Sequence, residues 1–340
     1  MRIEFPSTCV LANAATGIII DIAMRFEPVC YEHAARLIGR TPWEVSRDAA
    51  LLAAAHLAAM ETYGSDGCVV GLDIYNVEVE AYGGQIIEPP GEGVPAVGQP
   101  LCREVSDLLD LRLDPDRDGR LPLALEAARQ IAQTNAKADV RLPLSGPFTI
   151  ACHLLGMENM ICSLLTDPEV SSRVLLQLAE TQLQIGLLAH RNGFGVALFE
   201  SSVTPPLLSP QLFVERVLPA LEVVFNGLNA ESRRTTQLIV GGDTIHILDS
   251  MLSLAPGYII CPVETDQPAF MSRLPSDPQL TTRINMNPAV FLPGNLDAAI
   301  GEIQRVVALG RKYSNTTVGS LIPYEADTAI IQQVADTVNE

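Results

Sequence analysis

Eight short stretches rich in apolar and β-branched residues recur along this chain of 340 residues, with helical patterns between them. Several are almost continuously apolar, as strands buried on both faces of a parallel sheet are. Strands that alternate with helices indicate βα units around such a sheet. The expected strands are Ile18–Ile22, Cys68–Leu72, Val140–Leu144, Val196–Phe199, Gln237–Val240, Tyr258–Cys261, Arg283–Met286 and Thr316–Val318.

The clearest predicted helix is Pro168–Arg191, because Asp167 supplies a helix cap and Pro168 stands in the first turn. Residues 83–120 are instead rich in Gly, Pro and Asp, and we interpret them as an insertion near the barrel mouth. The other expected helices are Pro42–Tyr63, Leu121–Ala136, Gln211–Asn226, Thr244–Leu254, Leu296–Leu309 and Glu325–Val338.

An open doubly wound sheet usually carries a glycine-rich loop after its first strand. Residues 21–28 contain no glycine. Eight strands with helices between them therefore favour a single (β/α)8 TIM barrel over residues 1–340.

The net charge of the chain excludes some classes of binding partner. Asp and Glu outnumber Lys and Arg by 40 to 22, giving a net charge of −18. Such a surface repels nucleic acids and anionic membranes, so we expect neither as a partner. The seven cysteines form no CxxC pair, and the sequence shows no export signal or membrane span. These features predict a cytoplasmic location.

Chemistry in a barrel of this kind gathers where the strands end. A carboxylate at such a position can serve as a general acid or base, or it can cap a helix. For Asp243 both roles stay open, whereas Asp73 and Glu200 are interpreted as functional. The polar residues at the expected strand ends are Asp73, Glu200, Asp243, Glu264 and Asn285, and His246 follows shortly after Asp243. No HxxxH, HxH or GxSxG motif is present.

Five stretches in order resemble the uroporphyrinogen decarboxylase superfamily, which includes corrinoid-dependent methyltransferases. The resemblance spans about residues 18–338 and implies a distorted (β/α)8 barrel. It also places Asp73 where the family has its catalytic aspartate. The stretches are residues 61–83, the Ser145-Gly146-Pro147-Phe148-Thr149 turn, residues 208–219, Asn285-Met286-Asn287-Pro288 with Gly294, and Ile322-Pro323 with the following helix.

The decarboxylase branch of this family binds its acidic tetrapyrrole through an MRQAGR segment. The matching residues here are Met24-Arg25-Phe26-Glu27-Pro28-Val29, so only the first arginine is kept. A glutamate in this turn and a net charge of −18 oppose a substrate with eight carboxylates. Decarboxylation of that substrate is disfavoured.

The thiol-methylating branch holds zinc through HxCG and a later GC. The matching positions here are Ile239, Gly241 and Ser320, none of which is a soft ligand. We therefore expect no zinc and no thiol acceptor such as coenzyme M.

The leading hypothesis from the resemblance is a methyltransferase that works with a corrinoid carried on a separate protein. The chain has no DxHxxG cobalamin motif of its own. The substrate would be a small methyl donor or acceptor, such as an aryl methyl ether or a methylamine. The catalytic candidates are Asp73, Glu200, Asp243 and His246, and the substrate-binding candidates are Arg25, Tyr75, Asn76, Glu264 and Asn285.

Two alternatives stay open. One is a divergent decarboxylase in which Arg25 holds a carboxylate and Asp73 supports the developing charge. The other is a barrel without catalytic activity that serves as a binding subunit. The sequence does not select the substrate, the direction of transfer, or whether the chain forms a homodimer.

Overall fold

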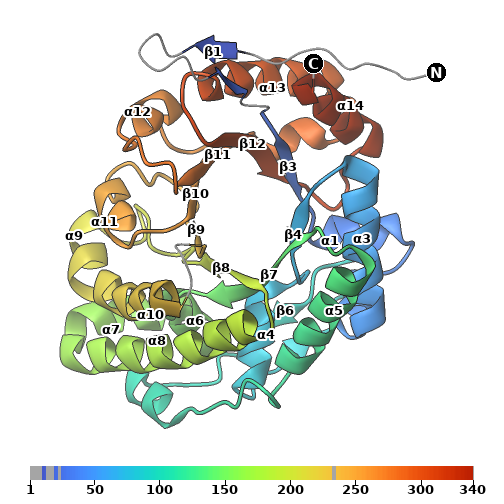
Figure 1. The fold of residues 1–340 in the computed structure, drawn as a ribbon. Helices are drawn as coiled ribbons and strands as arrows, with labels where there is room; N and C mark the ends of the chain where they lie inside the picture. The colour runs from blue at the N-terminus through green and yellow to red at the C-terminus, as the bar shows by residue number, and fades with distance from the viewer. Residues whose placement is uncertain (1–9, 13–18, 22–23, 232–234, 340) are drawn as a thin grey trace.

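Eight parallel strands form the framework of the molecule in the computed structural model, which describes residues 10–12, 19–21, 24–231 and 235–339. They lie in a ring with helices outside it, which confirms the (β/α)8 barrel (Figure 1). From β4 to β12 each barrel strand pairs with the next barrel strand along the chain, β12 pairs with β3, and β3 and β4 are the two edge strands. In ring order they are β3 (Phe26–Val29), β12 (Thr316–Leu321), β11 (Thr281–Asn285), β10 (Tyr258–Cys261), β9 (Gln237–Ile239), β8 (Gly195–Phe199), β7 (Asp139–Ser145) and β4 (Gly67–Val69).

The first barrel strand is not the predicted one. Ile19–Asp21 forms β2, which pairs antiparallel with β1 (Val10–Ala12) in a separate two-stranded sheet. Ile18 and Ile22 lie outside the described residues. The barrel uses Phe26–Val29 instead, a strand that contains Pro28 and has no β-branched run to reveal it. Pro28 is tolerated because β3 is hydrogen bonded only to β12, and proline fits an edge strand.

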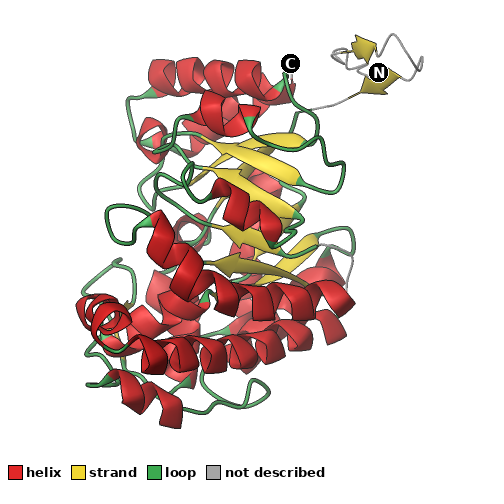
Figure 2. Cartoon of the chain, turned by 90° about the vertical axis from the view of Figure 1, so that its left-hand side faces the viewer, coloured by secondary structure: helices red, strands yellow, loops and turns green. Residues whose placement is uncertain are grey.

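The helices cover the outer faces of the strands (Figure 2). The prediction of Pro168–Arg191 is confirmed as α8, whereas the expected helix Pro42–Tyr63 is two helices with Asp48 capping the second. The α-helices are α1 (Glu32–Leu37), α2 (Pro42–Ser46), α3 (Ala49–Tyr63), α4 (Ile74–Ala81), α5 (Leu121–Thr134), α6 (Pro147–Leu155), α7 (Met157–Thr166), α8 (Pro168–Arg191), α9 (Pro210–Leu212), α10 (Leu218–Glu231), α11 (Leu248–Ser253), α12 (Gln267–Ser272), α13 (Leu296–Gly310) and α14 (Thr328–Asn339).

Among the residues that the structure describes, no single helix is long and apolar enough to cross a bilayer. Together α6 and α7 are long and apolar enough, but the two helices are bent by 113° relative to each other.

The expected insertion at 83–120 divides into two parts. The first holds the short hairpin of β5 (Ile86–Ile87) and β6 (Ala96–Val97), and Val94 and Pro95 beside it line the cavity at the barrel mouth. The second holds the 3-10 helix Val105–Asp110, which packs on α8 because the Gln177 side chain donates to carbonyls in that helix. Only the hairpin part borders the mouth.

Candidate functional site

A cavity of about 430 Å³ occupies the barrel mouth, where the carboxyl ends of the strands meet. This volume suits a small organic ligand. Five sequence candidates lie in its wall, namely Asp73, Tyr75, Asn76, Glu264 and Asn285. The structure therefore brings together residues that are more than 200 positions apart in the sequence.

Asp73 follows β4 and is held by Arg120. Two guanidinium nitrogens of Arg120 donate to the two carboxylate oxygens at 2.8 and 2.7 Å. The Asn76 side chain donates to the same carboxylate at 3.0 Å. The Asp73 side chain is only 1% exposed, so its charge is neutralised within the protein. This arrangement favours a role in positioning the mouth over proton transfer by Asp73.

Arg120 is itself shared between two carboxylates. Its Nε donates to Glu80 at 2.5 Å, and one terminal nitrogen also donates to the Ser46 carbonyl. Glu80 completes the network through an ion pair with Arg47. The last residue of the expected insertion thus joins α2, α4 and the end of β4.

Glu32 is a partly buried acid of the mouth. It is the first residue of α1 and lines the cavity. Burial raises the pKa of the Glu32 carboxyl, and the negative charge of nearby Asp73 raises it further. A carboxylic acid with a raised pKa can keep its proton closer to neutral pH and donate it to a bound ligand.

Aromatic side chains form one wall of the mouth. Tyr31 and Tyr75 each meet the Phe199 ring edge to face, with ring centres 6.4 and 6.2 Å apart. The other face of Tyr75 stacks on His153, and its hydroxyl shares a 2.5 Å hydrogen bond with Ser201. Such a wall favours a flat apolar ligand.

The other polar candidates of the mouth hold fixed positions. Asn76 donates to the Pro95 carbonyl at 2.7 Å and so ties the hairpin of the insertion to α4. Asn285 ends β11, and its side-chain oxygen accepts from Arg283 Nε at 2.9 Å. Glu264 is exposed at the rim. Of these three, Asn285 lies beside a charged partner that faces the same cavity.

Glu200 does not line the mouth cavity, although it directly follows β8. Its carboxylate is fully buried against the start of α6, where it accepts hydrogen bonds from the Phe148 and Thr149 backbone and from the Thr149 hydroxyl. Burial raises the pKa of Glu200 to about 7, even though these three bonds favour the ionised form. Gly146 permits this contact, because a Cβ there would lie 2.2 Å from the Glu200 carboxylate.

Asp243 and His246 also lie outside the cavity wall. The Asp243 carboxylate accepts from the Thr265 hydroxyl at 2.8 Å, and His246 approaches it to 3.9 Å. The His246 side chain is 63% exposed. The structure does not bring this pair to the residues that line the mouth.

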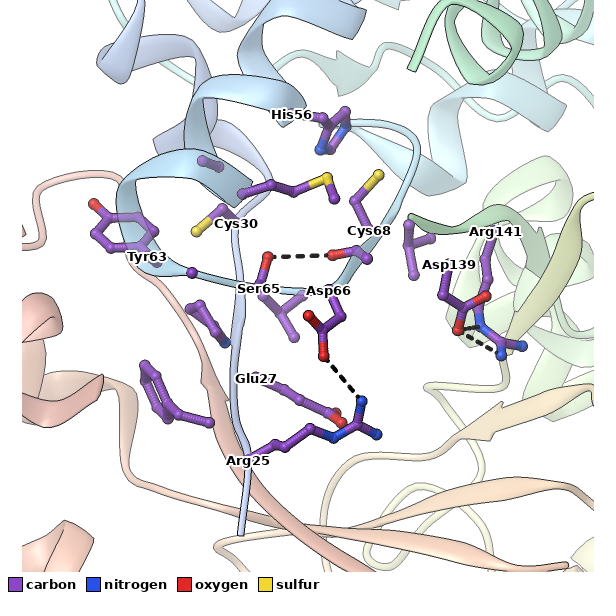
Figure 3. Close-up of a pocket in the computed structure, with 18 of the residues that line it drawn as sticks. Arg25, Glu27, Cys30, His56, Tyr63, Ser65, Asp66, Cys68, Asp139 and Arg141 are labelled. Carbon is purple, nitrogen blue, oxygen red and sulfur yellow. Dashed lines mark hydrogen bonds and ion pairs between the residues drawn. The ribbon is translucent and has the colours of Figure 1, made fainter. Parts of the chain in front are cut away.

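Arg25 lies at the opposite end of the barrel, because it precedes β3 instead of following it. There it lines a second cavity of about 380 Å³ between β3, α3 and β4, shown in Figure 3. Arg25 points toward Asp66, to which it donates at 3.1 Å. It therefore cannot share a ligand carboxylate with Asp73, which corrects the expected pairing of these two residues.

The zinc positions of the thiol-methylating branch coincide with part of the mouth. Ile239 and Gly241 line the cavity, and the Ser320 hydroxyl donates to the Met286 carbonyl at 3.0 Å. These side chains do not fit a zinc ion. Within the described ranges, no group of three His, Cys, Asp or Glu side chains could hold a metal. The zinc content of the protein stays a prediction.

The sequence candidates did not include three polar or charged residues of the mouth that bear on its chemistry, namely Tyr31, Glu32 and Arg283. The first two follow β3, the strand that the sequence pattern did not reveal. The sequence could have indicated Arg283, because an arginine inside a buried parallel strand is rare unless it has a partner or a ligand. The predicted strand began at Arg283, whereas β11 begins two residues earlier and places it in the strand interior.

Comparison with known proteins agrees with this architecture. The family model described as uroporphyrinogen decarboxylase (URO-D) matches residues 23–340. A methylated-thiol–coenzyme M methyltransferase of Methanosarcina mazei is 32% identical over 110 residues, which are 31% of this chain and 29% of that protein. The match thus spans less than a third of that relative. A solved methyltransferase from Methanosarcina mazei superposes with a TM-score of 0.75 over 92% of this chain and 93% of that chain, at 18% identity, and so shares the fold.

Proposed function

Because the chain belongs to the uroporphyrinogen decarboxylase family, we propose that it is a methyltransferase that moves a methyl group between a small substrate and the cobalt of a corrinoid protein. The relatives named as methyltransferases support this class of reaction. The observation that carries the proposal is Glu32, a partly buried acid facing a cavity with aromatic walls at the barrel mouth.

The cavity volume supports a site for the substrate in this chain and a site for the corrinoid on a partner protein. About 430 Å³ accommodates a substrate of one aromatic ring but not a corrinoid as well. The corrinoid, carried by a partner, would supply the cobalt centre that exchanges the methyl group. The residues of this chain would bind the substrate and turn its methyl group toward the opening.

If the substrate is the methyl donor, Glu32 has a defined role as a proton donor. When the methyl–oxygen bond of an aryl methyl ether breaks, its electron pair stays on the oxygen. That oxygen becomes a good leaving group if it receives a proton as the bond breaks. Glu32 would give this proton, and the aromatic wall of Tyr31, Tyr75 and Phe199 would hold the ring.

Asp73 and Arg120 would act through Glu32. The negative charge of Asp73 raises the pKa of Glu32, and Arg120 holds the buried Asp73 carboxylate in place. In this proposal Asp73 is a positioning residue. Glu200, Asp243 and His246 stand outside the cavity wall and have no part in the transfer.

The experiment supplies free cob(I)alamin together with aryl methyl ethers or methylamines. Loss of cob(I)alamin absorbance and release of an equal amount of phenol or amine, detected by chromatography, is the expected result. If no donor in either class is demethylated while the protein remains folded, the proposal is wrong. Release of carbon dioxide from an aromatic acid would instead support the decarboxylase alternative.

A further inference from the structure

Arg283 lies in the middle of β11 and points into the barrel, where it lines both the mouth cavity and the cavity at the opposite end. It pairs in register with Thr317 of β12, and Ile260 of β10 lies at the same level. Asn285, two residues further along the strand, lies nearer the opening. Arg283 therefore forms part of the floor of the mouth.

The Arg283 guanidinium is incompletely paired. The residue is 8% exposed, and its Nε donates to Asn285 Oδ1 at 2.9 Å. In the part of the chain that the structure describes, its two terminal nitrogens have no hydrogen-bond acceptor and no ion-pair partner. An arginine stays charged at all ordinary pH values, and a buried charge without a partner is costly.

In the described part of the chain, the neighbouring carboxylates form no ion pair with Arg283. Glu27, below it in the barrel, accepts a 2.5 Å hydrogen bond from the Tyr258 hydroxyl. Asp73 is paired with Arg120. Glu264 stands exposed at the rim, two positions after the cavity residue Pro262. The guanidinium is left with its planar pair of nitrogens available to a ligand.

The strand beside Arg283 is shaped to make room for it. Gly319 of β12 is the neighbour of Asn285 in the sheet. A Cβ at position 319 would lie 2.8 Å from Arg283 Cδ and 2.3 Å from the Glu27 carbonyl oxygen. Only glycine lets the arginine stem pass while β12 stays paired with β3.

We propose that the substrate of the mouth carries a carboxylate that binds Arg283. A planar guanidinium matches a carboxylate with two parallel hydrogen bonds. The walls above it are aromatic, so the ligand is a small aromatic acid with its carboxylate on the floor. That the bound acid is also the methyl donor rests on the proposed function.

The charges around the cavity also set the direction in which the ligand binds. Glu264 would repel a carboxylate near the opening, whereas Arg283 attracts it to the floor. A substituent on the far side of the ring from the carboxylate then points toward Glu32 and the opening. A methoxy group at that position would be the one presented for transfer.

The test measures binding by isothermal titration calorimetry without any corrinoid, using 4-methoxybenzoate and its neutral analogue 4-methoxybenzamide. The wild-type protein should bind the acid about tenfold or more tightly than the amide. Arg283→Gln should lose this preference, and Arg283→Lys should keep part of it, because lysine retains the charge but not the planar pair of donors. Arg129→Gln removes an exposed arginine of α5 and should behave as wild type.

The outcomes separate this inference from the proposed function. Equal binding of acid and amide by the wild type, binding of neither, or a preference that survives in folded Arg283→Gln would overturn the Arg283 site. If Arg283→Gln does not fold, the comparison between wild type and Arg283→Lys decides. A preference that depends on Arg283 without any methyl transfer to cob(I)alamin would sustain the carboxylate site and reject the reaction.

Discussion

Arg120 donates two hydrogen bonds of 2.8 and 2.7 Å to the Asp73 carboxylate, and both side chains are less than a tenth exposed. The pair joins the end of the second barrel strand to the end of the 83–120 segment. The aspartate that the family resemblance marks as catalytic is thereby a member of a buried ion pair, whereas Glu32, after a different strand, is a mouth acid with a raised pKa.

Arg120→Gln should destabilise the protein strongly, because it leaves Asp73 buried without its partner. We expect the free energy of unfolding to fall by about 3–5 kcal/mol. Urea denaturation followed by circular dichroism measures this change. Arg129→Gln, on the exposed face of α5, should alter it by less than about 0.5 kcal/mol. Equal effects of the two variants would show that the pair contributes little.

Glu32→Gln should slow methyl transfer by roughly 100-fold or more while leaving the melting temperature nearly unchanged, since the amide fills the same space but has no proton to give. In the wild type the rate should fall as pH rises through the raised pKa of Glu32, because the protonated form is the active one. The variant should lack this limb of the pH profile. Glu180→Gln, on the exposed side of α8, is the control. A variant that retains the limb would exclude Glu32 as the proton donor.

Glu200 should make the protein less stable as pH rises. Its pKa is raised from 4.5 to about 7 in the folded state, so between these values the folded protein binds more protons than the unfolded chain. Stability from this group is therefore full below pH 4.5 and is lost as pH approaches 7. His56, whose pKa burial lowers to about 4, acts in the opposite direction over part of this range.

Comparing wild type with Glu200→Gln removes the contribution of Glu200 together with its coupling to the Glu78 charge, whereas His56 stays in both proteins. The difference between the two unfolding free energies should change by up to about 1.4 kcal/mol per pH unit between pH 4.5 and 7. Urea titrations at half-unit steps measure it. A difference that does not vary with pH would mean that Glu200 titrates normally.

Gly146→Ala should destabilise the protein by roughly 1–3 kcal/mol, because the added methyl group would displace the buried Glu200 carboxylate from the start of α6. Gly301→Ala is the matched control. Position 301 lies inside α13 with open space around it, so alanine there should stabilise the protein by about 0.5–1 kcal/mol. Thermal melts of both variants give the sign directly. Stabilisation by both would contradict the close contact at Gly146.

Val94→Asp should weaken methyl transfer to a corrinoid protein more than transfer to free cobalamin. Val94 lines the mouth and is 45% exposed, which places it where a docked partner would pack. Rates with the two acceptors, measured at the same donor concentration, provide the comparison. An equal loss with both acceptors would assign Val94 to the substrate cavity alone.

Periodicity alone was sufficient for most of the barrel. The long helix Pro168–Arg191 carries its own start signal, and runs such as Tyr258–Cys261 are apolar throughout, so both were identified at their observed bounds. The first strand was missed because Phe26–Val29 has a proline and a glutamate. Its strand conformation comes from pairing with β12, almost 300 residues later in the chain, which no local pattern encodes.

By itself the sequence determined the class of fold, the family and the strand ends at which polar residues gather, because these depend on local composition and order. Only the tertiary structure decided which of those residues share a cavity. Glu200 and Asp73 both follow barrel strands, yet one faces a helix start and the other a buried arginine. Arg25 and Arg283 are both barrel arginines, yet only Arg283 reaches the mouth. The direction of a side chain and the charge that meets it depend on packing between distant segments, and these determine the chemistry of the site.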